Sequence, residues 1–275
     1  MTLIVQKYGG TSVADTNSLK LVAERIIECK EDNNDVVVVP SAMGSSTDEL
    51  IHLASQLSEK PTPREMDMLL SAGERITMSL LSMHLNSLGY SSFSLTGSQA
   101  GIITTSRHGK AEIEEITGER VKEGIDQGDI VIVAGFQGFN RDTREITTLG
   151  RGGSDATAVA LAAALGAERC EIFTDVEGVY TADPRIITNA QLIDEITYDE
   201  IHECETEFFN MVKDKGLFDI EPLELIGPIA PRSVFSFRVK GTSPSDIAGF
   251  LDMQNVCVRT GHMCCLLYTS DAADE

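Results

Sequence analysis

The sequence has no long hydrophobic run and few positive charges. No apolar stretch approaches the roughly 18 residues that a membrane-spanning helix needs, and the N-terminal residues lack the pattern of an export signal. Lysine and arginine together number 22 against 43 aspartates and glutamates, which gives a formal net charge of −21. Such a charge repels nucleic-acid phosphates and anionic lipids. We therefore expect neither a nucleic-acid partner nor a membrane partner.

The six cysteines also lack a pattern of shared function. None belongs to a C-x-x-C pair, and the histidines add no metal-ligand spacing beside them. We therefore expect reduced thiols, a cytoplasmic location and no metal held by protein side chains alone. The acidic residues do cluster, with eleven of them and two lysines between Asp194 and Glu224. This density is more typical of a solvated helical face than of an acidic docking site.

What is present is typical of a folded α/β protein. Hydrophobic residues make up 42% of the 275 residues and charged residues 24%, and the length allows two domains or one large unit. Short β-branched runs alternate with longer helical patterns, which predicts a mainly parallel sheet covered by helices on both faces. We expect strands over 3–6, 36–39, 91–95, 130–134, 145–148 and 170–174, and helices over 17–29, 48–58, 63–87, 119–126 and 156–165. Ser46 or Thr47 is the expected N-cap of the helix over 48–58.

Three glycine-containing loops follow predicted strands, and they begin at Lys7, Ser41 and Gly150. Glycine lets backbone N–H groups approach an anion, so three such loops suggest a ligand rich in phosphate. The P-loop sequence and a complete G-x-G-x-x-G are both missing. Lys7 could neutralise a transferring phosphoryl group, and Arg151 could clamp a carboxylate.

Each of these residues also has a plainer interpretation. Gly9 and Gly10 could form only a tight turn, and Arg151 could be a surface arginine. Asp155 could be only the cap of the helix over 156–165, and Glu74 could be an ordinary solvated residue.

Four segments together resemble the signatures of the aspartate kinases. They are Lys7-Tyr8-Gly9-Gly10-Thr11-Ser12, Ser41-Ala42-Met43-Gly44, residues 147–155 (TTLGRGGSD) and residues 173–185 (FTDVEGVYTADPR). Their order and spacing match as well, and the resemblance covers about residues 2–201. It implies the amino-acid kinase fold, a three-layer αβα sandwich with a mainly parallel central sheet, an N-lobe for aspartate and a C-lobe for ATP.

The resemblance implies phosphoryl transfer from ATP to the β-carboxylate of L-aspartate, the first step toward lysine, threonine and methionine. ATP would enter with Mg²⁺ bridging its phosphates, and a homo-oligomer is expected. The catalytic residues that it implies are Lys7 and Asp155; the substrate-binding residues are Ser41, Thr47, Glu74, Arg151 and Gly152; the nucleotide-binding residues are Gly9, Gly10, Thr174, Asp175, Tyr180, Asp183 and Arg185.

The sequence departs from the aspartate kinase pattern after Ile201. Gly227 stands where the family has a phosphate-binding lysine. We therefore expect a catalytic domain over 1–235 that diverges after 201, a remnant of the link to a missing ACT regulatory region over 236–263, and a non-native tail over 264–275. Two alternatives remain: a catalytically impaired nucleotide-binding or regulatory module of this fold, and another amino-acid kinase acting on a glutamate derivative, carbamate or UMP.

Overall fold

The computed structural model describes residues 1–150, 152–175, 178–181, 189–214, 223–226 and 236–239. The chain divides into two compact units at the boundary between Asp175 and Val176. Each unit is described by itself below.

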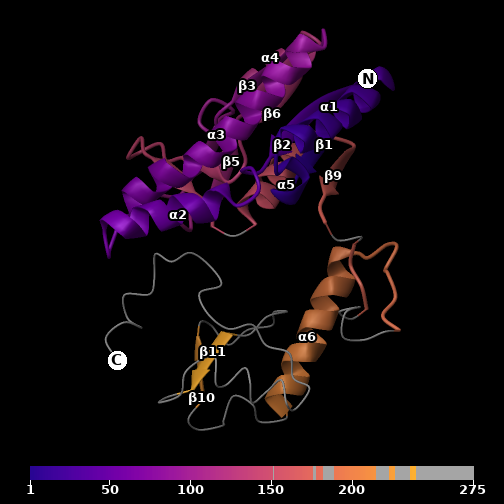
Figure 1. The fold of residues 1–275 in the computed structure, drawn as a ribbon. Helices are drawn as coiled ribbons and strands as arrows, with labels where there is room; N and C mark the ends of the chain where they lie inside the picture. The colour runs from indigo at the N-terminus through magenta and orange to yellow at the C-terminus, as the bar shows by residue number, and fades with distance from the viewer. Residues whose placement is uncertain (151, 176–177, 182–188, 215–222, 227–235, 240–275) are drawn as a thin grey trace. The chain divides into compact units, whose positions relative to one another are not determined.

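The first unit is built on a five-stranded sheet in which every neighbouring pair is parallel (Figure 1). Its strand order is β3-β6-β2-β1-β9. β-branched residues of the central strands are buried, among them Val36–Val39 of β2 and all four residues of β6, as expected for a sheet covered on both faces. The strands are β1 (Thr2–Tyr8), β2 (Asn34–Pro40), β3 (Ser92–Leu95), β6 (Ile130–Val133) and β9 (Arg169–Phe173).

Two hydrophobic clusters show that helices cover both faces of this sheet. One cluster joins the sheet to α1 (Thr16–Glu31) and α3 (Pro63–Ser87). The other joins it to α4 (Glu119–Asp126) and α5 (Gly153–Leu165). The predicted three-layer arrangement is therefore confirmed for the first unit, together with its mainly parallel sheet.

A second, smaller sheet was only partly predicted. It has the order β5-β4-β7-β8 and mixes antiparallel and parallel pairs. Its strands are β4 (Ile102–Thr104), β5 (Ile113–Ile116), β7 (Gln137–Phe139) and β8 (Ile146–Thr148). Only β8 was expected, because three- or four-residue strands show too few alternations to reveal a period.

Two helix starts differ from the predictions. Helix α2 (Ser46–Leu57) already includes Ser46 and Thr47; Ser45 is its N-cap, without a side-chain capping bond, so the predicted cap is wrong. Helix α5 begins at Gly153, with Gly152 as N-cap at φ 74°. Asp155 therefore lies inside the first turn of α5, and its carboxylate is available for another contact. A short 3₁₀ helix, η1 (Thr11–Val13), follows the first glycine loop.

The second unit contains α6 (Tyr198–Asp214) and an antiparallel pair of strands, β10 (Leu223–Ile226) and β11 (Ser236–Val239). The acidic side chains of α6 whose surroundings are described are exposed, as predicted for a solvated face: Asp199, Glu200, Glu203, Glu207 and Asp214. The tail predicted from residue 264 and the segment around Gly227 lie outside the described residues. No helix among the described residues is long and apolar enough to cross a membrane.

Candidate active site

The predicted site gathers where three parallel strands end side by side. In the sheet register Tyr8 of β1 lies beside Pro40 of β2 on one side and Phe173 of β9 on the other. The loops that follow these strands therefore leave from one edge of the sheet. Ligands of open parallel sheets bind at this carboxyl edge. The shared edge brings the loop after β1 together with the loop after β2, which is more than 30 residues later in the chain. It also brings it together with the loop after β9, which is more than 160 residues later.

Lys7 forms the main charged contact of this edge. Its side chain is buried, at 8% exposure, and its Nζ lies 2.7 Å from Oδ1 of Asp155. Asp155 is about half exposed and comes from the first turn of α5, where a carboxylate also faces the positive end of the helix dipole. The two residues that the resemblance implies as catalytic, Lys7 and Asp155, thus form an ion pair in the structure. It fixes an ammonium group at the mouth of the first glycine loop.

Backbone hydrogen bonds tie the first two glycine loops to each other. Gly44 N–H donates to the Gly10 carbonyl at 3.1 Å, and Ser41 N–H donates to the Tyr8 carbonyl at 2.9 Å. A Cβ on Gly10 would lie 3.1 Å from the Ala42 carbonyl oxygen, which is tighter than ordinary contact. Glycine is therefore needed at position 10 for this close approach. Gly9 N–H in turn donates to the Phe173 carbonyl at 3.0 Å.

Glu74 is a buried carboxylate and not the solvated residue that its helical position would suggest. It is 4% exposed, and its Oε2 has no hydrogen-bond partner among the described residues. Burial raises the pKa of Glu74 to about 7, and a hydrogen bond from the Ala42 backbone lowers it in part. A buried, half-satisfied carboxylate beside a ligand loop is the kind of group that a cationic ligand atom completes.

The other predicted residues divide between the two units. Ser41 follows β2 directly, and Thr47 is half-buried in the first turn of α2. Thr174 and Asp175 follow β9, where the Thr174 hydroxyl donates to Asp175 Oδ1 at 3.1 Å. Tyr180 lies in the second unit and pairs with Leu192 in an isolated antiparallel bridge. The positions of Arg151, Asp183 and Arg185 lie outside the described residues.

Sequence reasoning missed a buried polar network beside the third glycine loop. Asp67 of α3 is fully buried and accepts hydrogen bonds from the Thr148 hydroxyl and the Gly109 N–H. A nitrogen of the His108 ring lies 2.6 Å from the same carboxylate. One signal was available in the sequence: Asp67 is seven residues before Glu74, so both carboxylates lie on the apolar stripe of α3.

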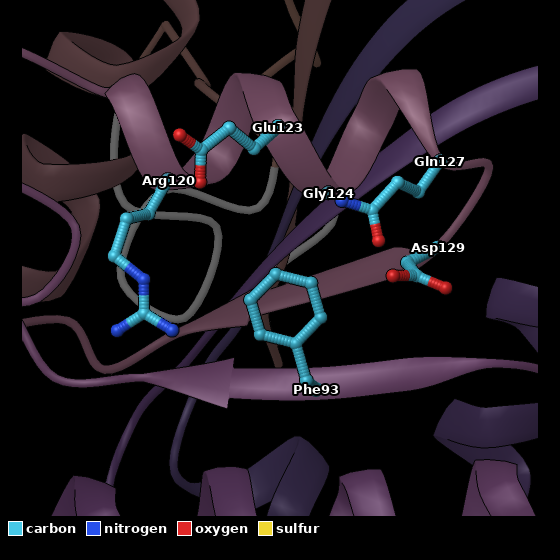
Figure 2. Close-up of a pocket in the computed structure, with 6 residues that line it drawn as sticks. All are labelled: Phe93, Arg120, Glu123, Gly124, Gln127 and Asp129. Carbon is cyan, nitrogen blue, oxygen red and sulfur yellow. The ribbon is translucent and has the colours of Figure 1, made fainter.

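A cavity elsewhere in the first unit carries none of the predicted residues. Its volume is about 230 Å³, and it lies between α4 and strand β3 at the edge of the sheet opposite β9 (Figure 2). Figure 2 shows the Phe93 ring beneath α4, with polar side chains from the helix around it. A Cβ on Gly124 would lie 2.5 Å from this ring, so the glycine serves close packing of helix on strand.

Comparison with known proteins identifies the family to which the fold belongs. The model of the amino acid kinase family matches residues 2–219. A second model, of class-V aminotransferases, matches residues 186–273 and so overlaps the end of the first match.

Individual relatives of the chain are aspartokinases. The chain is 58% identical over 203 residues to an aspartokinase of Mycolicibacterium smegmatis, a match that covers 74% of this chain and 48% of the relative. The crystal structure of an aspartate kinase from Synechocystis aligns with a TM-score of 0.64 at 49% identity, over 74% of this chain and 33% of that one. Aspartokinase III of E. coli, in complex with lysine and aspartate, aligns with a TM-score of 0.63 at 28% identity, over 73% and 56%.

The chain spans about half the length of the curated relatives that it matches. Within the matched part, the predicted resemblance to aspartate kinases and the predicted fold are confirmed. Because the family model covers well over half of the 275 residues, and because the parallel sheet, its glycine loops and the Lys7–Asp155 pair are all in place, the chain belongs to the amino acid kinase family.

Proposed function

We propose that the protein transfers the γ-phosphoryl group of ATP to the β-carboxylate of L-aspartate, which yields ADP and 4-phospho-L-aspartate. The observation that carries the proposal is the Lys7–Asp155 pair at the end of β1 together with the buried, half-satisfied Glu74, which is hydrogen-bonded to Ala42 in the loop after the neighbouring strand β2. The aspartokinase relatives support the choice of aspartate as acceptor. The reaction would be a first step toward lysine, threonine and methionine.

The chemistry requires a cation between two anions. A carboxylate oxygen attacks the γ-phosphorus, the bond from that phosphorus to the bridging oxygen breaks, and ADP leaves with the electron pair. Catalysis of such a transfer is mainly positioning and neutralisation of charge. Lys7 would neutralise the transferring group, and Asp155 would hold its ammonium in place at 2.7 Å. Because this ammonium is buried and fixed before substrates arrive, little reorganisation is needed during the reaction.

Glu74 would recognise the α-ammonium of aspartate. Its free Oε2 has lost its hydration through burial and has no partner among the described residues, so an ammonium group would restore the missing hydrogen bonds and the charge balance. Ser41 lies in the loop after β2 and Thr47 in the first turn of α2, and Gly152 is the N-cap of α5. We assign the α-carboxylate to Arg151 from its motif alone.

ATP would bind through the glycine loops and through Thr174, Asp175, Tyr180, Asp183 and Arg185. We propose that Mg²⁺ is held mainly by the ATP phosphates, because it dehydrates reluctantly and favours phosphate oxygens. Among the described residues no group of three His, Cys, Asp or Glu side chains could hold a metal ion. When bound, the ion would share the neutralisation of phosphate charge with Lys7.

Hydroxylamine trapping tests the proposed reaction directly. The purified protein is incubated with ATP, Mg²⁺, aspartate and hydroxylamine, and the expected product is aspartyl hydroxamate in an amount equal to the ADP formed. A parallel panel replaces aspartate with a glutamate derivative, carbamate or UMP. Absence of hydroxamate from well-folded protein, or faster ADP release with another acceptor, would overturn the proposal.

We also propose a cytoplasmic location and a homo-oligomeric state. Cys29, Cys170 and Cys204 are free thiols, which suits a reducing compartment. Helix α3 exposes Ile76, Leu80 and Met83 at a spacing that forms one apolar stripe, and such a stripe suits burial against another copy. Sedimentation of the purified protein measures the oligomeric state, and a monomer at all concentrations would contradict it.

A further inference from the structure

The geometry points to Asp67 as a positioning residue: through Thr148 and Gly109 it holds Gly150, and with Gly150 the start of α5 at Gly152, a residue assigned to aspartate binding. The inference rests on the proposed function for the role of Gly152. The contacts themselves do not depend on the proposed function, and they all lie among described residues of the first unit.

Asp67 holds two segments that are far apart in the sequence. The Thr148 hydroxyl donates to Asp67 Oδ1 at 2.6 Å across 81 residues of chain. Gly109 N–H donates to the same carboxylate, at 3.0 Å to Oδ1 and 3.2 Å to Oδ2. The two segments are also joined directly, because Ala111 N–H donates to the Thr148 carbonyl at 2.9 Å. One side chain on α3 therefore organises the end of β8 and the loop between β4 and β5.

Both segments converge on the third glycine loop. Thr148 is the last residue of β8, two positions before Gly150. A Cβ on Gly150 would lie 3.2 Å from the Gly109 carbonyl oxygen, so the loop that Asp67 holds packs directly against this glycine. Gly150 has φ 78°, and its carbonyl accepts from Gly153 N–H at 3.0 Å. The Asp67 contacts therefore end at the turn that leads into α5.

The cost of burying Asp67 argues that its contacts are specific. Asp67 has 0% exposure, and a buried carboxylate without donors would cost several kcal/mol. His108 completes its shell: Nδ1 lies 2.6 Å from Asp67, and Nε2 lies 3.1 Å from Glu145 at the start of the β8 hairpin. Both contacts are hydrogen bonds when the ring carries both protons. An apolar residue would fill the space but could not orient Thr148 and Gly109 at once.

A neighbouring pair provides a matched control. The Thr147 hydroxyl lies 2.6 Å from the Thr104 hydroxyl, and both residues are fully buried. Successive residues of a strand point to opposite faces, so Thr147 makes its contact away from Asp67. Replacing Thr147 or Thr148 by valine removes one buried hydroxyl bond from the same strand. Only the second replacement disconnects the turn from Asp67.

The experiment compares Thr148→Val, Thr148→Ser, Asp67→Asn and Thr147→Val in the full chain. For Thr148→Val and Asp67→Asn we expect the aspartate KM to rise about tenfold, with kcat and the ATP KM changed less than about twofold. Thr148→Ser restores the hydroxyl and is expected to restore the KM. Thr147→Val is expected to lower the melting temperature as Thr148→Val does while the aspartate KM stays unchanged.

Hydrogen exchange of the free protein separates this inference from the proposed function. We expect the peptide over residues 146–153 to exchange faster in Thr148→Val than in Thr147→Val, whether or not the protein phosphorylates aspartate. Equal exchange in the two variants would overturn the positioning role. An equal rise in the aspartate KM for both variants would also overturn it. If the wild-type protein gives no hydroxamate but the exchange differs as expected, only the proposed function fails.

Discussion

At the scale of single residues, the site depends on two side chains whose charges are set by burial. Lys7 is a buried cation paired with Asp155, and Glu74 is a buried carboxylate with an unsatisfied oxygen. Burial removes water from both groups, and the Glu74 oxygen without a partner regains none of the lost hydration. Both become better satisfied when an anionic phosphate and a cationic ammonium enter the site. The residues are therefore matched to ligands of opposite charge.

Replacing Lys7 by alanine is expected to act mainly on the chemical step. The substitution removes the charge that neutralises the transferring phosphoryl group, so kcat is expected to fall by about 10²–10³. Arg151→Ala is expected instead to raise the aspartate KM. Initial rates at varied ATP and aspartate measure both parameters. Lys20→Ala, on the exposed face of α1, serves as control; the reverse pattern for Lys7 and Arg151 would contradict the assigned roles.

Glu74 is expected to make stability depend on pH in the absence of ligand. Its pKa is raised from 4.5 to about 7 by burial, so the folded state holds a proton that the unfolded state has lost between these values. The contribution of this proton is complete below about pH 4.5 and is lost as pH rises through about 7.

Glu74→Gln should therefore be more stable than the wild type at pH 8, by at most about 3 kcal/mol, and similar to it near pH 5. Urea unfolding at the two pH values measures the difference. Glu24→Gln changes an exposed glutamate of α1 and should show no such pH dependence. A glutamine variant that is less stable at pH 8 would show that Glu74 has a cationic partner in the free protein.

At the scale of elements, the regular parts of the fold could be predicted and the irregular parts could not. Helix α3 and strand β2 were predicted because their apolar residues repeat over many positions. Strands β4, β5 and β7 are too short for that, and their pairing depends on distant segments. The role of Asp67 could not be predicted either, because its partners His108 and Thr148 are 41 and 81 residues away in the sequence.

The motif residues could be assigned to a site because they follow strands whose order the fold determines. Lys7, Gly9, Gly10 and Ser41 lie together because β1 and β2 are adjacent and parallel. The assignment of Lys7 and Asp155 to one site came from the family resemblance, and in the structure the two side chains form an ion pair. Local sequence alone left a cap role open for Asp155, because an aspartate near a helix start often caps the helix.

The packing of α3 against the second glycine loop makes a prediction about Gly73. A Cβ on Gly73 would lie 2.7 Å from the Ala42 Cβ, which real structures do not tolerate. Alanine in a helix is normally favoured over glycine by up to about 1 kcal/mol, but here the overlap should dominate. We expect Gly73→Ala to lower the free energy of unfolding by about 1–3 kcal/mol.

The matched variant for this prediction removes the opposing methyl group. Gly73→Ala combined with Ala42→Gly restores the space, so the double variant should recover part of the loss seen in Gly73→Ala. Urea unfolding of the two single variants and the double variant forms a complete cycle. Additive losses in this cycle would show that the two Cβ atoms do not compete for the same space.

At the scale of the whole molecule, two family models match different but overlapping parts of the chain. The amino acid kinase model ends at residue 219, whereas the class-V aminotransferase model begins at 186. The sequence also departs from the aspartate kinase pattern after Ile201, so the change in sequence character falls within the overlap of the two matches. The predicted domain boundaries after 235 and 263 stay predictions. The site residues from Lys7 to Asp175 all precede the overlap.

The net charge of −21 should make the stability of the protein depend on salt. Like charges repel most strongly in the compact state, and the screening length falls from about 30 Å at 0.01 M salt to about 8 Å at 0.15 M. We expect the melting temperature at pH 8 to rise by several degrees when NaCl is increased over this range. The sequence pI is about 4.5, so the same increase of salt at pH 5 should have little effect. Scanning calorimetry at the two pH values measures both shifts. A melting temperature that falls with salt at pH 8 would mean that attractive ion pairs such as Lys7–Asp155 outweigh the general repulsion between acidic side chains.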